Sequence, residues 1–185
     1  MTHLRLGEPA PDFALTTVEG ETITLHDALA DGRSAVLVFL RHLGCLPCRA
    51  HVTELCNRSE ALTNLNASVL IVSFGTLPAV QRWLAETCGE FHVGIDRDRS
   101  VYTAYGLERS FWRSRSLRTR WFYFNAWLAG TPTHTSQGED LSQLGGDFVV
   151  DPSGRLRLVH PSREPVDRPS VDQIFDVLTS IRAGR

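Results

Sequence analysis

The 185-residue sequence contains no lysine, so all 19 of its basic side chains are arginines. The missing amine excludes Schiff-base chemistry and a lysine general base. No apolar run reaches the roughly 18 residues that a membrane-spanning helix requires, and the first residues lack the apolar stretch of a signal peptide. The net charge of −2 argues against nucleic-acid binding. We therefore expect a soluble, cytoplasmic protein with no transmembrane segment and no nucleic-acid partner.

Cysteine is also scarce, with four residues in the whole sequence. A chain of this length buries roughly 70% of its unfolded surface and does not need disulfides to fold. The sequence has no internal repeat, low-complexity tract or flexible linker. We therefore expect residues 1–185 to form a single domain. In a cytoplasmic protein, a Cys-x-x-Cys pair is more often catalytic or metal-binding than structural.

The apolar pattern predicts strands that alternate with helices, as in an α/β domain with a central mixed sheet flanked by helices. Ser170 and Gln173 have the spacing of a capping box at the start of the last helix. The segment 107–144 fits the alternation least well. The predicted elements are, in chain order, strand 22–25, a short helix 26–30, strand 34–40, a helix 48–62, strand 68–74, a helix 78–88, strand 91–95, a hairpin over 147–160 and a helix to 181.

A Cys-x-x-Cys pair, Cys45 and Cys48, follows directly on the apolar strand 34–40 and leads into the predicted helix. This order places one sulfur at a helix N-terminus, where free N–H groups and the helix dipole favour a thiolate. A thiolate with a second thiol one turn away can attack a disulfide or a peroxide and then be released. The pair therefore indicates redox chemistry.

Three neighbours are candidates for tuning the pKa of these thiols. Arg41 and Arg49 would favour the anion, and His42 would do so when protonated. The alternative is that each is an ordinary solvated side chain.

A zinc site is the other use of such a pair, and it needs four ligands. The other two cysteines, Cys56 and Cys88, are isolated from each other in the sequence, and no two histidines stand at ligand spacing. We therefore expect no metal. Within one helix, Cys56 lies about 12 Å from Cys48, too far for a disulfide. We expect Cys56 to be a buried apolar residue and Cys88 to be structural, both as free thiols, with a resolving role for Cys88 left open.

Several motifs in the right order resemble the alkyl hydroperoxide reductase/thiol-specific antioxidant superfamily, whose fold is that of thioredoxin. They are Gly7-x-x-Ala10-Pro11-Asp12-Phe13-x-Leu15, Gly44-Cys45-x-x-Cys48-Arg49 and Leu144-Gly145-Gly146-x-Phe148-Val149-Val150. The last two together are most similar to the peroxiredoxin-like 2 group. The resemblance implies a thioredoxin-like fold, thiol-dependent oxidoreduction without a cofactor, a reductant such as thioredoxin, glutathione or another dithiol, and a small-molecule peroxide or disulfide substrate.

The sequence differs from peroxiredoxins at the motif Pro-x-x-x-Thr/Ser-x-x-Cys. Counted back from Cys48, Arg41 and Cys45 occupy the proline and hydroxyl positions, and counted back from Cys45, Val38 and His42 do so. Neither cysteine has the pair that positions a peroxide. These differences favour dithiol–disulfide exchange over peroxide reduction.

A second difference lies at Gly145, where the thioredoxin fold has a cis-proline and where peroxiredoxins place an arginine nearby. We expect Gly145 and Gly146 to let the backbone approach the sulfurs closely, or to form a flexible strand entry.

Residues 111–127, called the aromatic insert below, hold seven of the 16 aromatic residues and four arginines. Leu117, Trp121, Phe124 and Leu128 have the spacing of one helix face. The insert could pack on the core or on a second subunit of a homodimer, form a lid over the substrate with Trp121 and Trp127, or lie on a membrane surface.

We interpret the sequence as a peroxiredoxin-like thiol–disulfide oxidoreductase in which Cys45 attacks, Cys48 resolves and an external dithiol resets the pair. One alternative is a thiol peroxidase with Cys48 peroxidatic and Cys45 resolving. The other is a non-catalytic redox sensor or binding module.

Overall fold

The structure is a computed structural model that describes residues 4–131, 136 and 138–184. Its strands form one seven-stranded sheet in the order β2-β1-β5-β4-β3-β6-β7. The strands are β1 (Ala14–Thr17), β2 (Thr22–Thr24), β3 (Ser34–Phe39), β4 (Ala67–Ser73), β5 (His92–Ile95), β6 (Gly146–Val150) and β7 (Leu156–Pro161). The helices are α1 (Leu25–Ala28), α2 (Leu46–Cys56), α3 (Ser59–Asn64), α4 (Leu77–Thr87), α5 (Ser100–Ala104), α6 (Leu117–Leu128) and α7 (Val171–Arg182), with single 3₁₀ turns at Ala30–Gly32 and Arg113–Arg115.

The sheet is mixed, as the sequence predicts. Strands β3, β4 and β5 run parallel, and β6 lies antiparallel to β3 on the other side. Strand β3 therefore has a neighbour on each side, and all six of its residues are buried, which explains its uninterrupted apolar sequence. The predicted hairpin is present as β6 and β7, and the capping box of Ser170 and Gln173 opens α7.

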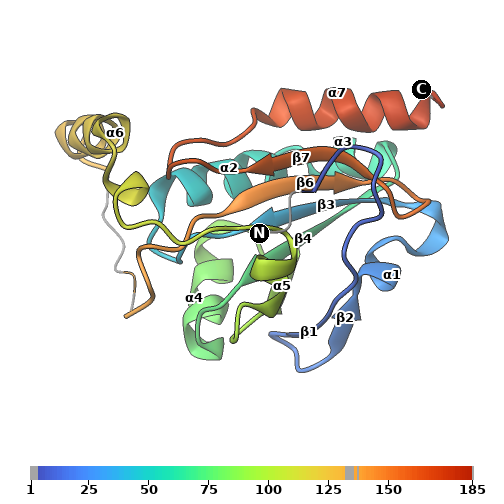
Figure 1. Cartoon of the computed structure of the whole chain (residues 1–185), viewed down its shortest axis with the longest axis horizontal. Helices are drawn as coiled ribbons and strands as arrows, with labels where there is room; N and C mark the ends of the chain where they lie inside the picture. The colour runs from blue at the N-terminus through green and yellow to red at the C-terminus, as the bar shows by residue number, and fades with distance from the viewer. Residues whose placement is uncertain (1–3, 132–135, 137, 185) are drawn as a thin grey trace.

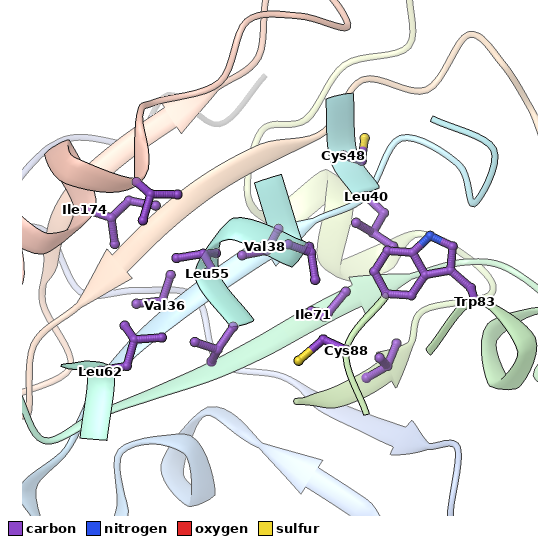
Figure 2. Packing of buried hydrophobic residues seen from close by; sticks show 14 of the residues in the cluster. Val36, Val38, Leu40, Cys48, Leu55, Leu62, Ile71, Trp83, Cys88 and Ile174 are labelled. Atoms are coloured by element: carbon purple, nitrogen blue, oxygen red, sulfur yellow. The ribbon is translucent and has the colours of Figure 1, made fainter. Parts of the chain in front are cut away.

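Two apolar clusters cover the two faces of the sheet. One contains residues of α2, α3, α4 and α7, and the other contains residues of α1 and α5. Figure 1 shows α2 and α7 on the same side of the sheet. In Figure 2, Cys48 stands at the upper edge of the first cluster near Leu40, while Cys88 lies near Ile71 and Trp83. The cysteine pair thus lies at one edge of a packed apolar cluster (Figure 2).

The predicted helix over 48–62 is two helices. Asn57 is the C-cap of α2 and Arg58 has a non-helical ψ of 21°, after which α3 begins at Ser59. Asparagine and serine side chains compete for backbone hydrogen bonds and favour helix ends. The apolar spacing continues across this break, so the sequence pattern does not reveal the boundary between α2 and α3.

The expectation of two free thiols is wrong for Cys56 and Cys88. They form a disulfide with a Cα–Cα distance of 6.0 Å. Cys56 ends α2 and Cys88 follows the last residue of α4, so the bond joins the ends of two helices packed on the same face. Helix geometry limits only the distances within one helix, whereas the contact between α2 and α4 depends on the order of the strands.

The aromatic insert forms helix α6 at one end of the molecule, beyond the sheet (Figure 1). Its predicted apolar face is exposed: Leu117, Trp121, Phe124 and Leu128 all lie open to solvent. Packing on the core of this chain is therefore excluded for these side chains. Across the described ranges, no helix is both long and apolar enough to span a membrane. Residues 132–135 and 137, which belong to the poorly fitting segment 107–144, lie outside the described residues.

Candidate active site

The Cys45–Cys48 pair lies where the chain leaves β3 and enters α2. Cys45 is the N-cap of α2, and its Sγ accepts a hydrogen bond of 3.3 Å from the backbone N–H of Cys48. Pro47 occupies the first turn, where a missing N–H costs nothing. The two cysteines are joined as a disulfide with a Cα–Cα distance of 5.3 Å. The N-terminal N–H groups and the dipole of α2 therefore act on the sulfur of Cys45.

Both members of the pair are 0% exposed. Helix α6 contributes to their surroundings through Tyr123, whose phenol oxygen accepts a hydrogen bond from the Leu46 backbone. Burial raises the pKa of Tyr123, while the charge of Arg41 and this hydrogen bond lower it. Because Leu46 is the first residue of α2, Tyr123 occupies the helix end that carries Cys45. A substrate reaches the sulfurs only after side chains around this end move.

An arginine that the sequence analysis missed contacts Cys48. The Nη2 atom of Arg168 lies 3.4 Å from Cys48 Sγ and donates to the Phe39 carbonyl at 2.7 Å. Its Nη1 atom lies 2.9 Å from both carboxylate oxygens of Asp147. A guanidinium cation at this distance stabilises a thiolate on Cys48 when the pair is reduced.

Asp147 and His51 complete the buried group next to Cys48. His51 Nε2 lies 3.1 Å from Asp147 Oδ1, and Asp147 is fully buried on β6. Burial raises the pKa of Asp147, but the charge and hydrogen bonds of Arg168, together with the nearby His51, outweigh it and the pKa is lowered overall. The carboxylate is therefore ionised and holds Arg168 in place. A buried charge of this kind needs such partners.

The arginine next to the pair, Arg49, is held by other groups. Its Nε atom donates to the Leu43 carbonyl at 3.1 Å, and its Nη2 atom lies 2.9 Å from a carboxylate oxygen of Glu86. Its guanidinium also lies 5.9 Å from the ring centroid of Trp83. Arg49 thus ties the loop before Cys45 to α4, and Glu86 offsets part of its charge.

The two candidates on the other side of the pair are buried. Burial and the charge of Arg41 lower the pKa of His42 to about 4, so the ring is neutral at pH 7 and brings no positive charge to a thiolate. Arg41 is 4% exposed and donates to the carbonyls of Gln143 and Leu141. Burial also lowers the pKa of Arg41, to about 10, which leaves it charged at pH 7.

A buried carboxyl, Glu139, supports the loop between β3 and α2. Its Oε2 atom accepts a 2.7 Å hydrogen bond from the Leu43 N–H. Its Oε1 atom is buried without a hydrogen-bond partner among the described residues. Burial raises the pKa of Glu139 to about 7, although the Leu43 N–H and the charge of Arg99 lower it.

The two glycines at the start of β6, Gly145 just before the strand and Gly146 as its first residue, make close approaches to groups other than sulfur. A Cβ on Gly145 would lie 2.7 Å from Arg168 Nη2 and closer still to the Phe39 carbonyl. A Cβ on Gly146 would lie 2.7 Å from Leu107. The missing side chain at Gly145 is what gives Arg168 room beside Cys48.

A large cavity lies between the start of α2 and α6, with a volume of about 1120 Å³. Leu46, Pro47 and Arg168 line it from the side of the cysteines, and Trp121 and Phe122 line it from α6. Trp127 is not part of its lining, although it lies on the same helix. Of the two tryptophans considered for a lid, Trp121 is therefore the one that borders a cavity at the site.

The sequence held partial signals for the missed residues. Asp147 is a carboxylate inside an otherwise apolar strand, which indicates a buried partner. His51 follows Cys48 by three residues on the same helix face. Arg168 carries no local signal, because it comes from the loop between β7 and α7. Within the described ranges, no group of three or more histidine, cysteine or acidic side chains is arranged to hold a metal.

A buried Cys-x-x-Cys disulfide at the start of a helix, set on a mixed sheet with helices on both faces, defines a thiol redox protein of thioredoxin-like fold. The chain belongs to the AhpC/TSA family, whose profile matches residues 6–159. The resemblance found in the sequence motifs is thereby confirmed. The family implies a dithiol reductant.

Distant relatives match most of the chain. It is 22% identical over 183 residues to peroxiredoxin-like 2C of Mus musculus, covering 94% of this chain and 80% of that protein. It is 23% identical over 161 residues to peroxiredoxin-like 2C of Homo sapiens, covering 82% of this chain and 71% of that protein. The peroxiredoxin-like 2 resemblance is therefore confirmed as distant homology.

Solved structures confirm the fold. Peroxidoxin BcpB from Mycobacterium tuberculosis superposes with a TM-score of 0.71 at 18% identity, covering 99% of both chains. AhpC of the same organism superposes with a TM-score of 0.68 at 17% identity, covering 98% of this chain and 95% of that one. The thioredoxin-like fold predicted from the sequence is thus correct.

Proposed function

We propose that the protein is a thiol–disulfide oxidoreductase in which Cys45 attacks and Cys48 resolves. The observation that carries the proposal is the N-cap position of Cys45, whose sulfur accepts the Cys48 N–H. This arrangement stabilises negative charge on Cys45, and the thiolate is the nucleophile in thiol–disulfide exchange. Cys48 is placed one turn later, within bonding distance.

The proposed cycle uses only the two sulfurs and an external dithiol. The Cys45 thiolate attacks a substrate disulfide, forms a mixed disulfide and releases one substrate thiolate, which takes up a proton. The Cys48 thiolate then attacks Cys45 Sγ, releases the second substrate thiol and leaves the Cys45–Cys48 disulfide. Thioredoxin, glutathione or another thiol reductant returns two electrons and two protons to the pair. The cycle requires no cofactor or metal.

A second function, peroxide reduction by Cys48, is favoured by one specific contact. Arg168 lies 3.4 Å from Cys48 Sγ and would stabilise a thiolate there. In this scheme Cys48 takes one oxygen from a peroxide to become a sulfenic acid, the peroxide leaves as water or an alcohol, and Cys45 condenses with the sulfenic acid to release water. The missing proline and hydroxyl at the peroxide position count against this function.

Stopped-flow mixing of the reduced protein with hydrogen peroxide, an organic peroxide and a protein disulfide separates these functions. We expect the disulfide to react fastest and Cys45→Ser to abolish that reaction. A faster reaction with either peroxide, lost in Cys48→Ser, would support the peroxidase. Slow reaction with all three would favour a redox sensor or binding module.

We further propose that residues 1–185 act as one cytoplasmic domain. The compact sheet with a cluster on each face supports the single domain. The exposed apolar side chains of α6 leave a homodimer as one use of that surface. Sedimentation at several protein concentrations would detect it.

A further inference from the structure

A second cavity lies on the other side of the cysteine pair, with a volume of about 390 Å³. It is bounded by the turn that leads into Cys45, through Arg41, His42 and Gly44, and by the aromatic insert. Its described lining contains three arginines, Arg41, Arg115 and Arg120, and no aspartate or glutamate. The larger cavity differs in this respect, since Glu54 and Glu86 line it together with its arginines.

The charge of Arg41 is buried without a carboxylate partner among the described residues. Its Nε and Nη2 atoms donate to two backbone carbonyls, at 3.2 Å from Gln143 and 2.8 Å from Leu141. Besides burial, the groups that affect its pKa are the phenol of Tyr123 and a second cation, Arg168. A buried cation ordinarily has an anionic partner. The place for one here is the cavity that Arg41 lines.

The two arginines of the insert that line the cavity also form no ion pair within the described part of the chain. Their neighbours do: Arg113 pairs with Glu108, and Arg118 lies 3.2 Å from Glu164. The insert therefore pairs Arg113 and Arg118 with carboxylates. Arg115 instead lies over the ring of Phe111, 4.2 Å from its centroid, which leaves its charge without a carboxylate partner among the described residues.

Two buried polar atoms at this cavity also lack a hydrogen-bond partner among the described residues. They are Nδ1 of His42, a residue that is 7% exposed, and Oγ of Ser114. Both residues line the cavity. Unsatisfied buried polar atoms are costly and rare in folded proteins. A polar ligand in the cavity would satisfy both.

Resting on the thiol–disulfide exchange proposed above, we infer that this cavity binds the carboxylate of a small acidic disulfide and presents its sulfur to Cys45. Three arginines match an oxyanion in charge, and guanidinium groups commonly bind carboxylates in proteins. The volume suits a small molecule. Gly44 lines the cavity and immediately precedes Cys45, so their Cα atoms are about 3.8 Å apart. A ligand held here by a carboxylate would bring a sulfur a few bonds away next to Cys45 once the side chains that bury this residue move.

The step is the exchange already described, with the substrate class specified. The Cys45 thiolate attacks one sulfur of the acidic disulfide, and the other half leaves as a thiolate that takes up a proton. Cys48 then displaces the half bound to Cys45. The disulfide gains two electrons and two protons, and the protein dithiol loses them.

The test compares two disulfides of similar length, the dianion 3,3′-dithiodipropionate and the neutral 2-hydroxyethyl disulfide. Each rate with the reduced protein is divided by the rate of the same disulfide with free dithiothreitol. This division corrects for the difference in intrinsic reactivity between the two disulfides. We expect this normalised rate to favour the dianion by about tenfold or more. Arg120→Gln should reduce the preference by about tenfold. The matched control Arg113→Gln, at an arginine that does not line the cavity, should keep it.

Calorimetry on the oxidised protein tests the cavity separately from the chemistry. The probe is 3,3′-thiodipropionate, a thioether that cannot exchange. Binding that Arg120→Gln weakens and Arg113→Gln preserves supports the inference. If both disulfides react equally well, or if the thioether does not bind, the inference is overturned while the oxidoreductase proposal stands. If neither disulfide reacts although the thioether binds, the proposed function fails and the anion site remains.

Discussion

The guanidinium of Arg168 connects Cys48 to Asp147, with its Nη2 atom 3.4 Å from the sulfur and its Nη1 atom 2.9 Å from the carboxylate. The two cysteines therefore have different sources of thiolate stabilisation. Cys45 has the end of α2, and Cys48 has a cation fixed by a buried carboxylate. The division of roles between the sulfurs depends on which source is stronger.

We predict that Cys45 has the lowest pKa of the reduced thiols, because the helix N-terminus acts on it directly. The rate of iodoacetamide alkylation against pH, measured in Cys45→Ser and Cys48→Ser, gives the pKa of the thiol that remains in each variant. Faster alkylation of Cys48 at neutral pH would reverse the assigned roles.

Replacing the cation next to Cys48 should destabilise the thiolate form of Cys48 specifically. In a Cys45→Ser background, we expect Arg168→Gln to raise the pKa of Cys48 by about one unit, equivalent to about 1.4 kcal/mol. Arg168→Lys keeps the charge and should restore part of the shift. An unchanged alkylation profile in Arg168→Gln would show that the contact does not act on the thiolate.

The Cys56–Cys88 disulfide should stabilise the fold without taking part in exchange. It closes a loop with a sequence separation of 32, for which the chain-entropy estimate is about 4 kcal/mol. We expect the double variant Cys56→Ala/Cys88→Ala to lower the Tm by roughly 10 °C and to keep its rate of disulfide exchange. Loss of exchange with an unchanged Tm would give this pair a catalytic role instead.

Glu139 should make stability depend on pH. Its pKa is raised from the usual 4.5 to about 7, so between these values the folded protein binds more protons than the unfolded chain. Stability contributed by this group therefore falls as the pH rises from 4.5 to 7 and is constant above that. The free energy of unfolding of the wild type minus that of Glu139→Gln, measured with urea, should follow this course. His42, whose pKa is lowered to about 4, gives an opposite slope in both proteins and cancels in the difference. A difference independent of pH would contradict the prediction.

The two exposed tryptophans of α6 provide a matched pair for the lid hypothesis. Trp121 and Trp127 are 66% and 67% exposed, but only Trp121 lines the large cavity. We expect Trp121→Ala to raise KM for a bulky apolar disulfide several-fold and Trp127→Ala to leave KM unchanged. Neither should change the Tm by more than about 2 °C, because neither side chain is buried. Equal effects of the two substitutions on KM would end the lid hypothesis for Trp121.

The sequence predicted the parts of the site that are local in the chain. The uninterrupted apolar run of β3 and the cysteines directly after it determine the strand, the turn and the start of α2. The hairpin predicted over 147–160 is likewise present, as β6 and β7. These features depend on short-range spacing, which a sequence displays directly.

The parts that could not be predicted depend on the order of the strands. Arg168 reaches Cys48 from 120 residues later, and the pairing of Cys56 with Cys88 requires α2 and α4 to lie together. The apolar face of α6 is exposed, since helix periodicity shows that a face is apolar and not what covers it. Asp147 was overlooked because the motif treats its position as variable.

The positions of the tryptophans allow the intrinsic fluorescence of the protein to report on the surroundings of the cysteine pair. Of the four tryptophans, Trp83 is 1% exposed in the core, while Trp112, Trp121 and Trp127 are 84%, 66% and 67% exposed in the insert and α6. Intrinsic emission will therefore come mainly from water-exposed indoles at the cysteine end of the molecule. Tryptophan fluorescence can therefore monitor changes at that end without an added label. Replacing Trp112 and Trp127 by phenylalanine leaves Trp121, at the large cavity, as the single exposed indole.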